Sequence, residues 1–319
     1  MPRKGSPWTG LNAVFAKEFG DHLGSARMRV LEWLVLLTGL AAVYTAIQDL
    51  RTLSAQDPFL FLRLFTLSKE PLPSFISLIG FLVPLVAIGL GFDSVNSEFN
   101  RRTLSRVLAQ PIYRDALLFG KFLAALATLG VSLLALWLLI IGIGLFLLGV
   151  PPSGEEILRG VAFLATTLAY AAVWLAVAML FSVIFRSAAT SALCALGLWL
   201  FFTVLWPILV PFTAQILSPS ESMIVLGIPS VDQIMLQQTL DRFSPNTLFG
   251  EAVLAILRPT TRALGFVLPS QVQGAIGGTP LPFGQSLLLI WPQVTGLVAA
   301  AILLFAGSYV TFQRQEVRA

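Results

Sequence analysis

The sequence predicts an all-α, polytopic membrane protein with six transmembrane helices. An N-terminal amphipathic interface helix and a helical outer-surface segment between helices 5 and 6 complete the predicted fold. Three observations support this fold: hydrophobic residues make up 56% of the 319 residues, charged residues only 11%, and mean hydropathy is +0.85. Such a composition is typical of a chain whose solvent is lipid, not water.

The six helices are predicted from uncharged runs long enough to cross a hydrocarbon core about 30 Å thick. The first run can be extended back to Val30 if Glu32 lies at the headgroups. The last is the densest apolar part of the longer uncharged run 263–313. The predicted spans are residues 33–48, 71–92, 122–154, 160–185, 187–220 and 286–312.

The first 29 residues carry seven charges and lack the apolar core of a cleaved signal peptide. Their apolar residues recur at helical spacing, which predicts an amphipathic helix along the membrane surface. A disordered tail is the alternative. The apolar positions are Leu11, Val14, Phe15, Phe19 and Leu23.

The distribution of Lys and Arg predicts the orientation. With the N-terminus inside, 13 of the 20 basic residues fall in cytosolic segments, so both termini are expected in the cytosol. Residues 151–159 are then predicted to form a tight outer turn, and Arg186 with Ser187 a short inner one.

The long outer segment contains helix signals of its own. Ser230 is placed to cap one helix, and a second runs between two prolines from Ser244. We interpret the segment as a helical cap, with a re-entrant hairpin over 263–276 as the alternative. The chain thus divides into 1–29, the interface helix; 30–213, spans 1–5; 214–285, the outer segment; and 286–319, span 6 and a cytosolic tail.

Several chemistries lack the residues that they need. A single Cys, Cys194, and a single His, His22, rule out an internal disulfide and disfavour a His/Cys metal site. Glu32 is the only charged residue within the spans, and it lies near one end, which disfavours an ion-coupled carrier. The net charge of +4 follows from the orientation and gives no reason to expect nucleic acid.

No nucleotide site is predicted in this chain. A phosphate-binding loop needs Ser or Thr after its Gly-Lys pair, but Phe122 follows Lys121, and Asp115 stands where the first Gly belongs. Any ATP hydrolysis is therefore expected on a separate polypeptide.

Charge is concentrated at residues 98–121, which hold seven charged side chains in 24 residues, whereas residues 122–154 hold none. A short helix with Leu104 on its apolar face is predicted to end before Pro111. From Ile112 the chain is predicted to run helically into the third span. Residues 93–121 would form a basic elbow at the cytosolic face, or a basic loop that only sets topology.

This stretch resembles the permease subunits of ATP-binding-cassette transporters of the type-two exporter family. The family pattern is Phe-Asp, a Glu five residues after the Asp, Gly-Thr-Leu, Pro-[Ile/Val]-x-Arg and then Gly-Lys. Arg102 stands where the family usually has Gly, so an unbroken helix is expected in place of a tight turn. The matching residues are Phe92, Asp93, Glu98, Thr103, Leu104, Pro111, Ile112, Arg114, Gly120 and Lys121. The N-terminal Phe-x-Lys-Glu-Phe of residues 15–19 is also similar to the family.

The resemblance implies a permease in the prokaryotic plasma (inner) membrane that pairs with a second copy or paralogue over two ABC ATPase subunits. This chain would bind no cofactor, since ATP and Mg would be held by the ATPase. The elbow would be the coupling helix. Its expected ATPase-coupling residues are Glu98, Arg101, Arg102, Thr103, Leu104, Arg106, Pro111 and Arg114.

Two functions from other classes remain as alternatives. A membrane scaffold or sensor would bind an ATPase or regulatory partner without moving a substrate. An ion-coupled carrier would need intramembrane charge that this sequence hardly offers. For a transporter, the almost uncharged spans favour a lipidic, amphiphilic or otherwise hydrophobic cargo.

Overall fold

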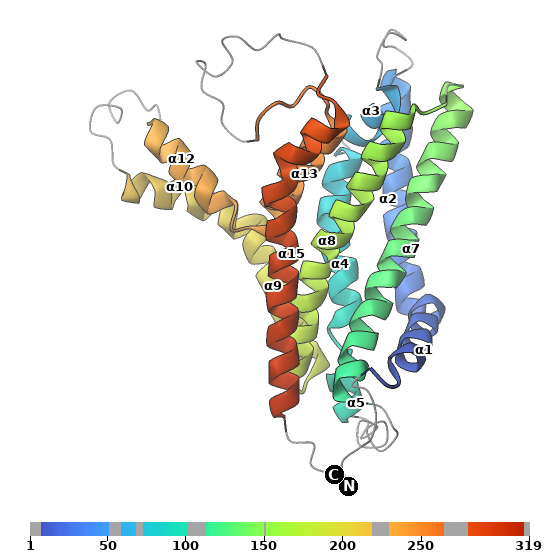
Figure 1. Cartoon of the computed structure of the whole chain (residues 1–319), viewed down its shortest axis with the longest axis vertical. Helices are drawn as coiled ribbons and strands as arrows, with labels where there is room; N and C mark the ends of the chain where they lie inside the picture. Colours follow the sequence, from blue (N-terminus) through green and yellow to red (C-terminus); the bar gives the residue numbers. More distant parts are fainter. Residues whose placement is uncertain are drawn as a thin grey trace.

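The computed structural model describes residues 8–50, 59–67, 73–100, 113–149, 151–218, 230–264 and 280–315. Within these ranges every regular element is a helix, and the long helices form a bundle (Figure 1). Six helical stretches are long and apolar enough to cross a membrane, which confirms the predicted fold class. They are Met28–Gln48, Phe75–Asn100, Arg114–Leu148, Gly154–Ile184, Ala188–Leu217 and Phe283–Arg314.

The bundle has two ends. Helices α1 (Leu11–Gly24) and α5 (Asn96–Asn100) lie at one end, called here the α1 end. Helices α3 (Leu60–Thr66) and α13 (Pro245–Leu257) lie at the other, the α13 end (Figure 1). The start of α7 (Arg114–Leu148) and the end of α15 (Phe283–Arg314) meet at the α1 end.

Helix α8 (Gly154–Ile184) forms the centre of the bundle. It packs against α4 (Phe75–Gly91), α7, α9 (Ala188–Leu200), α13 and α15. Its buried residues include Tyr170 and Trp174, the second of which is the largest fully buried side chain among the described residues. Helix α2 (Ala26–Leu50) packs against α4 and α7. In a bilayer such contacts come from close packing, since lipid is as apolar as the side chains.

The turn between α7 and α8 is shorter than predicted. Helix α7 ends before Gly149, which has the left-handed φ of 70° that favours glycine at a helix C-terminus. Helix α8 then begins at Gly154, because the Ser153 side chain and the Glu156 carboxylate cap each other's backbone N–H groups. Placing the whole of residues 151–159 in a turn was therefore wrong, and Arg159 belongs to the helix.

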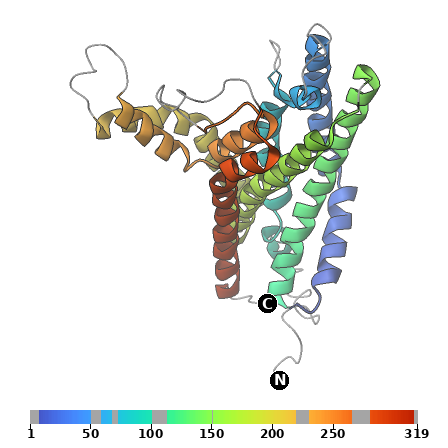
Figure 2. The ribbon, with the colours of Figure 1, turned by 45° about the horizontal axis from the view of Figure 1, so that its top comes forward.

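The fifth span bends away from the bundle. Helix α9 continues through a π-helical turn, η1 (Phe201–Leu205), into α10 (Trp206–Leu217), which carries Pro207 in its first turn. A π-turn followed by proline breaks the regular hydrogen-bond ladder and accounts for the bend. Helix α10 and α12 (Val231–Asp241) pack together and project to one side (Figures 1 and 2).

At the α13 end, Arg159 joins three helices although its side chain is 0% exposed. Its guanidinium donates to Glu155 Oε1 at 2.8 Å, to the Ile256 carbonyl of α13 at 2.8 Å and to the Leu281 carbonyl at 2.6 Å. It also donates to Ser286 Oγ of α15 at 3.1 Å. Only the planar fork of an arginine can serve so many acceptors at once.

Candidate functional site

The candidate site lies at the α1 end, where three parts of the chain meet on Lys121. Lys121 Nζ lies 3.0 Å from Glu18 Oε1 of α1 and 2.8 Å from Glu98 Oε1 of α5. The lysine side chain is 5% exposed, and the two glutamates are 14% and 15% exposed. We call Glu18, Glu98 and Lys121 the acid–lysine cluster. Because the ammonium has three donors and little water around it, it holds both carboxylates firmly.

The electrostatics of Glu18 reflect this pairing. Burial by itself would raise the pKa of Glu18, but the charge of Lys121 and the hydrogen bonds from Lys121 and Lys17 outweigh it. The net effect is a pKa below the usual value of 4.5. Glu18 is therefore ionised at neutral pH and keeps α1 attached to α7.

Apolar packing reinforces this attachment next to the cluster. Gly120 faces α1 so closely that a Cβ there would lie 2.8 Å from Val14 Cγ1 and 2.9 Å from Val14 Cβ. Val14 itself is 6% exposed. The absence of a side chain at position 120 thus lets the two helices touch, and Lys121 fixes their register.

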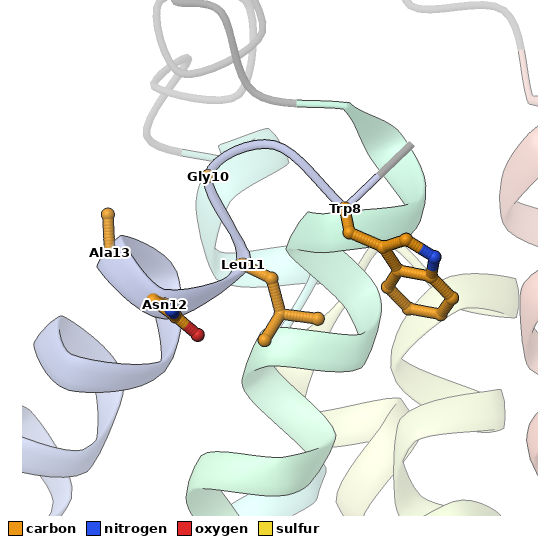
Figure 3. Close-up of a pocket in the computed structure, with 5 residues that line it drawn as sticks. All are labelled: Trp8, Gly10, Leu11, Asn12 and Ala13. Carbon is orange, nitrogen blue, oxygen red and sulfur yellow. The ribbon is translucent and has the colours of Figure 1, made fainter. Parts of the chain in front are cut away.

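The first turn of α1 is also held against α7. Gly10 precedes the helix with a left-handed φ of 91°, which turns the chain into α1. Figure 3 shows Leu11 projecting towards α7 and Ala13 pointing away from it. The Trp8 and Phe119 rings meet edge to face with centroids 5.2 Å apart. A cavity of about 560 Å³ here is lined by Trp8, Gly10, Leu11, Asn12 and Ala13.

A second group of contacts, called here the α7–α15 clasp, ties the start of α7 to the end of α15. Arg114 Nη1 donates to the backbone carbonyl of Gln315 at 3.0 Å and more weakly to that of Gln313 at 3.4 Å. Asp115 Oδ1 accepts from the Tyr309 hydroxyl at 3.0 Å and from the Gln313 amide. A cation at the C-terminal end of α15 satisfies carbonyls that have no intrahelical partner.

The stretch from α4 to α5 is attached to α8 in turn. Ser182 Oγ accepts the backbone N–H groups of Val95 at 3.0 Å and Asn96 at 3.2 Å. The Asn100 amide donates to the Arg186 carbonyl, between α8 and α9, at 2.9 Å. Both flanks of residues 101–112 are therefore bonded to long helices.

Two of the eight predicted coupling residues lie within the described residues, and they lie in different groups. Glu98 belongs to the acid–lysine cluster and Arg114 to the α7–α15 clasp. The other six fall in 101–112, outside the described residues. The predicted helix with Leu104 and the unbroken helix expected at Arg102 fall there too. The six residues are Arg101, Arg102, Thr103, Leu104, Arg106 and Pro111.

Sequence reasoning did not assign Glu18 or Lys121 to the site, although both stand in patterns that the resemblance uses. They are 103 residues apart, so no local spacing could pair them. The available signal was their opposite charge in two segments that each adjoin an apolar run.

Helix α7 is well suited to transmit displacement from this site. Its 35 residues run without interruption from Arg114 to Leu148, as predicted for the stretch from Arg114 onwards. At 1.5 Å per residue the helix is about 52 Å long, which exceeds a hydrocarbon core of about 30 Å. Part of α7 therefore extends beyond such a core, and Lys121 lies near its α1 end.

Comparison with known proteins identifies the family of this chain. A family model described as an ABC-2 family transporter protein matches residues 12–317. Over 150 residues, the chain is 36% identical to a probable ABC transporter permease protein NosY from Pseudomonas aeruginosa and 30% identical to one from Stutzerimonas stutzeri. Each alignment covers 44% of this chain, and the chain spans about half the length of these relatives, 52% and 51%. With nearly its whole length matched by the family model, this chain belongs to the ABC-2 transporter family.

Proposed function

We propose that this chain is the membrane-spanning permease subunit of an ATP-binding-cassette exporter, driven by ATP hydrolysis on a separate ATPase subunit. Family membership and the names of the two NosY relatives support the class. The observation that carries the coupling role is the acid–lysine cluster, which joins α1, α5 and α7 beside residues 101–112.

Force applied to the elbow would reach the spans through its two flanks. On one side, Glu98 is paired with Lys121 of α7, and Asn100 is bonded to the backbone beyond α8. On the other side, Arg114 is bonded to the end of α15. A displacement of the elbow would then move α4, α7, α8 and α15 together, because ion pairs and continuous helices are stiffer than a free loop.

The arginines of the elbow are proposed to contact carboxylates on the ATPase, which would favour the correct partner and its orientation. The complete transporter would contain two permease copies, or this chain with a paralogue, and two ATPases. It would lie in the prokaryotic plasma membrane with both termini of this chain in the cytosol. ATP and Mg would bind only to the ATPase.

The test is purification of the tagged full chain from its native membranes, followed by identification of bound proteins by mass spectrometry. An ABC ATPase should co-purify, and its ATP hydrolysis should change several-fold when the two are reconstituted together in liposomes. The matched control is the same ATPase in empty liposomes of the same lipid.

The scaffold or sensor alternative predicts a different combination of results. An ATPase would bind, but its hydrolysis would be the same with and without this chain. If no ATPase bound at all in a preparation that remained monodisperse, the permease proposal would be wrong.

A further inference from the structure

A second cavity lies between α1, α2, α4 and α7, and the acid–lysine cluster takes no part in it. Its volume is about 510 Å³, within the range of small-molecule sites. Of the 17 described residues that line it, three are polar: Arg29, Glu32 and Ser132. Trp33 and Val131 line it and are 61% and 49% exposed, so the cavity opens to the surface.

The polar residues of this cavity lie near the inner edge of the hydrocarbon core. The turn after Leu148 marks the far end of α7. Counting back about 20 residues, the length of helix that crosses a core about 30 Å thick, places the other edge near Thr128. Ser132 lies one helical turn from Thr128 towards the middle of the core, and its hydroxyl donates to Glu32 Oε1 at 2.8 Å. Glu32 therefore lies at the depth where acyl chains meet headgroups.

The two charged side chains of the cavity have opposite signs and stand one helical turn apart. Neighbours at this spacing often pair with each other. Among the described residues, however, no ion pair joins Arg29 to Glu32, and Glu32 is held instead by the neutral Ser132. An exposed arginine and a half-buried carboxylate at the mouth of an apolar cavity would match a ligand with a phosphate, an ammonium and an alkyl chain.

We propose that this cavity binds one zwitterionic aminophospholipid, a phosphatidylethanolamine, from the cytosolic leaflet. Its acyl chain occupies the apolar part of the cavity. Its phosphate accepts from Arg29, whose long side chain can reach along the surface to the headgroup. Its primary ammonium donates to Glu32, which Ser132 holds in place. This site is independent of the proposed transport function.

We choose an ethanolamine headgroup because the choline and glycerol headgroups lack either the N–H donors or the positive charge that Glu32 would bind. A phosphatidylcholine carries the same two charges, but its trimethylated ammonium has no N–H to give to Glu32. A phosphatidylglycerol has the phosphate and lacks the ammonium, so Glu32 would repel it. A lipid that merely coats the protein would show no preference among the three.

The experiment is native mass spectrometry of the delipidated full chain with phosphatidylethanolamine, phosphatidylcholine and phosphatidylglycerol of identical acyl chains. The wild-type protein should retain one ethanolamine lipid at least five-fold over either competitor. E32Q, which keeps the shape and the bond to Ser132, should reduce this preference to about one. R29Q should lower retention of all three lipids.

A second pair of variants tests the cavity itself. Ala135→Phe fills the cavity and should abolish retention, whereas Leu138→Phe adds bulk on an exposed face of the same helix outside the cavity and should not. Equal retention of the three lipids by the wild type would overturn the proposal, as would a preference that survives both E32Q and Ala135→Phe. If E32Q does not fold, the wild-type comparison and the phenylalanine pair still decide.

Discussion

Lys121 Nζ lies 2.8 Å from Glu98 Oε1, so the start of the third span and the end of the second are joined by an ion pair with little access to water. The same ammonium holds Glu18, 3.0 Å away. One lysine therefore connects the N-terminal helix, the stretch before residues 101–112 and the longest helix among the described residues. In the proposed coupling role, these bonds would carry displacement of residues 101–112 into the bundle.

Replacing Lys121 with Gln should lower the free energy of unfolding by about 3 kcal/mol, because two partly buried carboxylates lose their cation. Lys17→Gln is the matched control, since Lys17 also contacts Glu18 but is 66% exposed. Thermal unfolding of the purified proteins in detergent measures both. Equal midpoints for the two variants would show that the cluster adds no stability.

Gly120→Ala should push α1 away from α7, since its Cβ would lie 2.8 Å from Val14 Cγ1. Overpacking of this kind costs about 1–3 kcal/mol. On the same helix, a Cβ added at Gly142 would meet nothing within 4 Å, so Gly142→Ala should be neutral or slightly stabilising. Limited proteolysis of α1 and thermal unfolding would distinguish the two. Similar results for both would contradict the close contact.

The contact between α1 and α7 should weaken in acid. The pKa of Glu18 lies below its unfolded value near 4.5, so the stabilisation is fully present above that pH. It is lost as the pH falls through the lower folded pKa. Unfolding midpoints between pH 7 and pH 3.5 should therefore fall more steeply for the wild type than for Glu18→Gln. Parallel curves would mean that Glu18 is not linked to folding.

Arg159 should be essential for the α13 end of the bundle. Arg159→Lys keeps the charge but cannot reach Glu155 and the carbonyls of Ile256 and Leu281 together. A buried acceptor left without a donor, such as the Ile256 carbonyl, lowers the free energy of unfolding by about 1–3 kcal/mol. Arg258→Gln is the control, because Arg258 is exposed and makes a longer bond of 3.3 Å to Thr66. A lysine variant as stable as the wild type would show that the fork geometry is unimportant.

Much of the fold could be predicted from the sequence, because a helix in lipid must be apolar over about 20 residues whatever it packs against. A helix cap depends on residues that are close together in the chain, so Ser230 could be recognised from the sequence as the N-cap of α12. The fifth span bends near its middle, between α9 and α10. The π-turn that makes the bend begins at Phe201, and no residue type marks such a turn in a sequence.

The candidate site was predicted only in part, for a physical reason. A charge near the end of a span has the same appearance in a sequence whether it meets water or a buried partner. Arg159 was placed in a turn for this reason and is 0% exposed in the structure. The pairing of Glu18 with Lys121 depends on the packing of helices far apart in the chain, which hydropathy does not encode.

The elbow itself provides the last prediction. Arg101→Glu combined with Arg102→Glu should weaken association with the ATPase at least ten-fold, because two attractive contacts become repulsive. Membrane insertion should be unchanged, since 11 other basic residues remain on the predicted cytosolic side. Arg3→Glu with Lys4→Glu makes the same charge change near the N-terminus and should leave association intact. Pull-down with the purified ATPase measures both pairs. If both lose binding equally, the interaction depends on overall charge, and if neither does, the elbow is not the docking site.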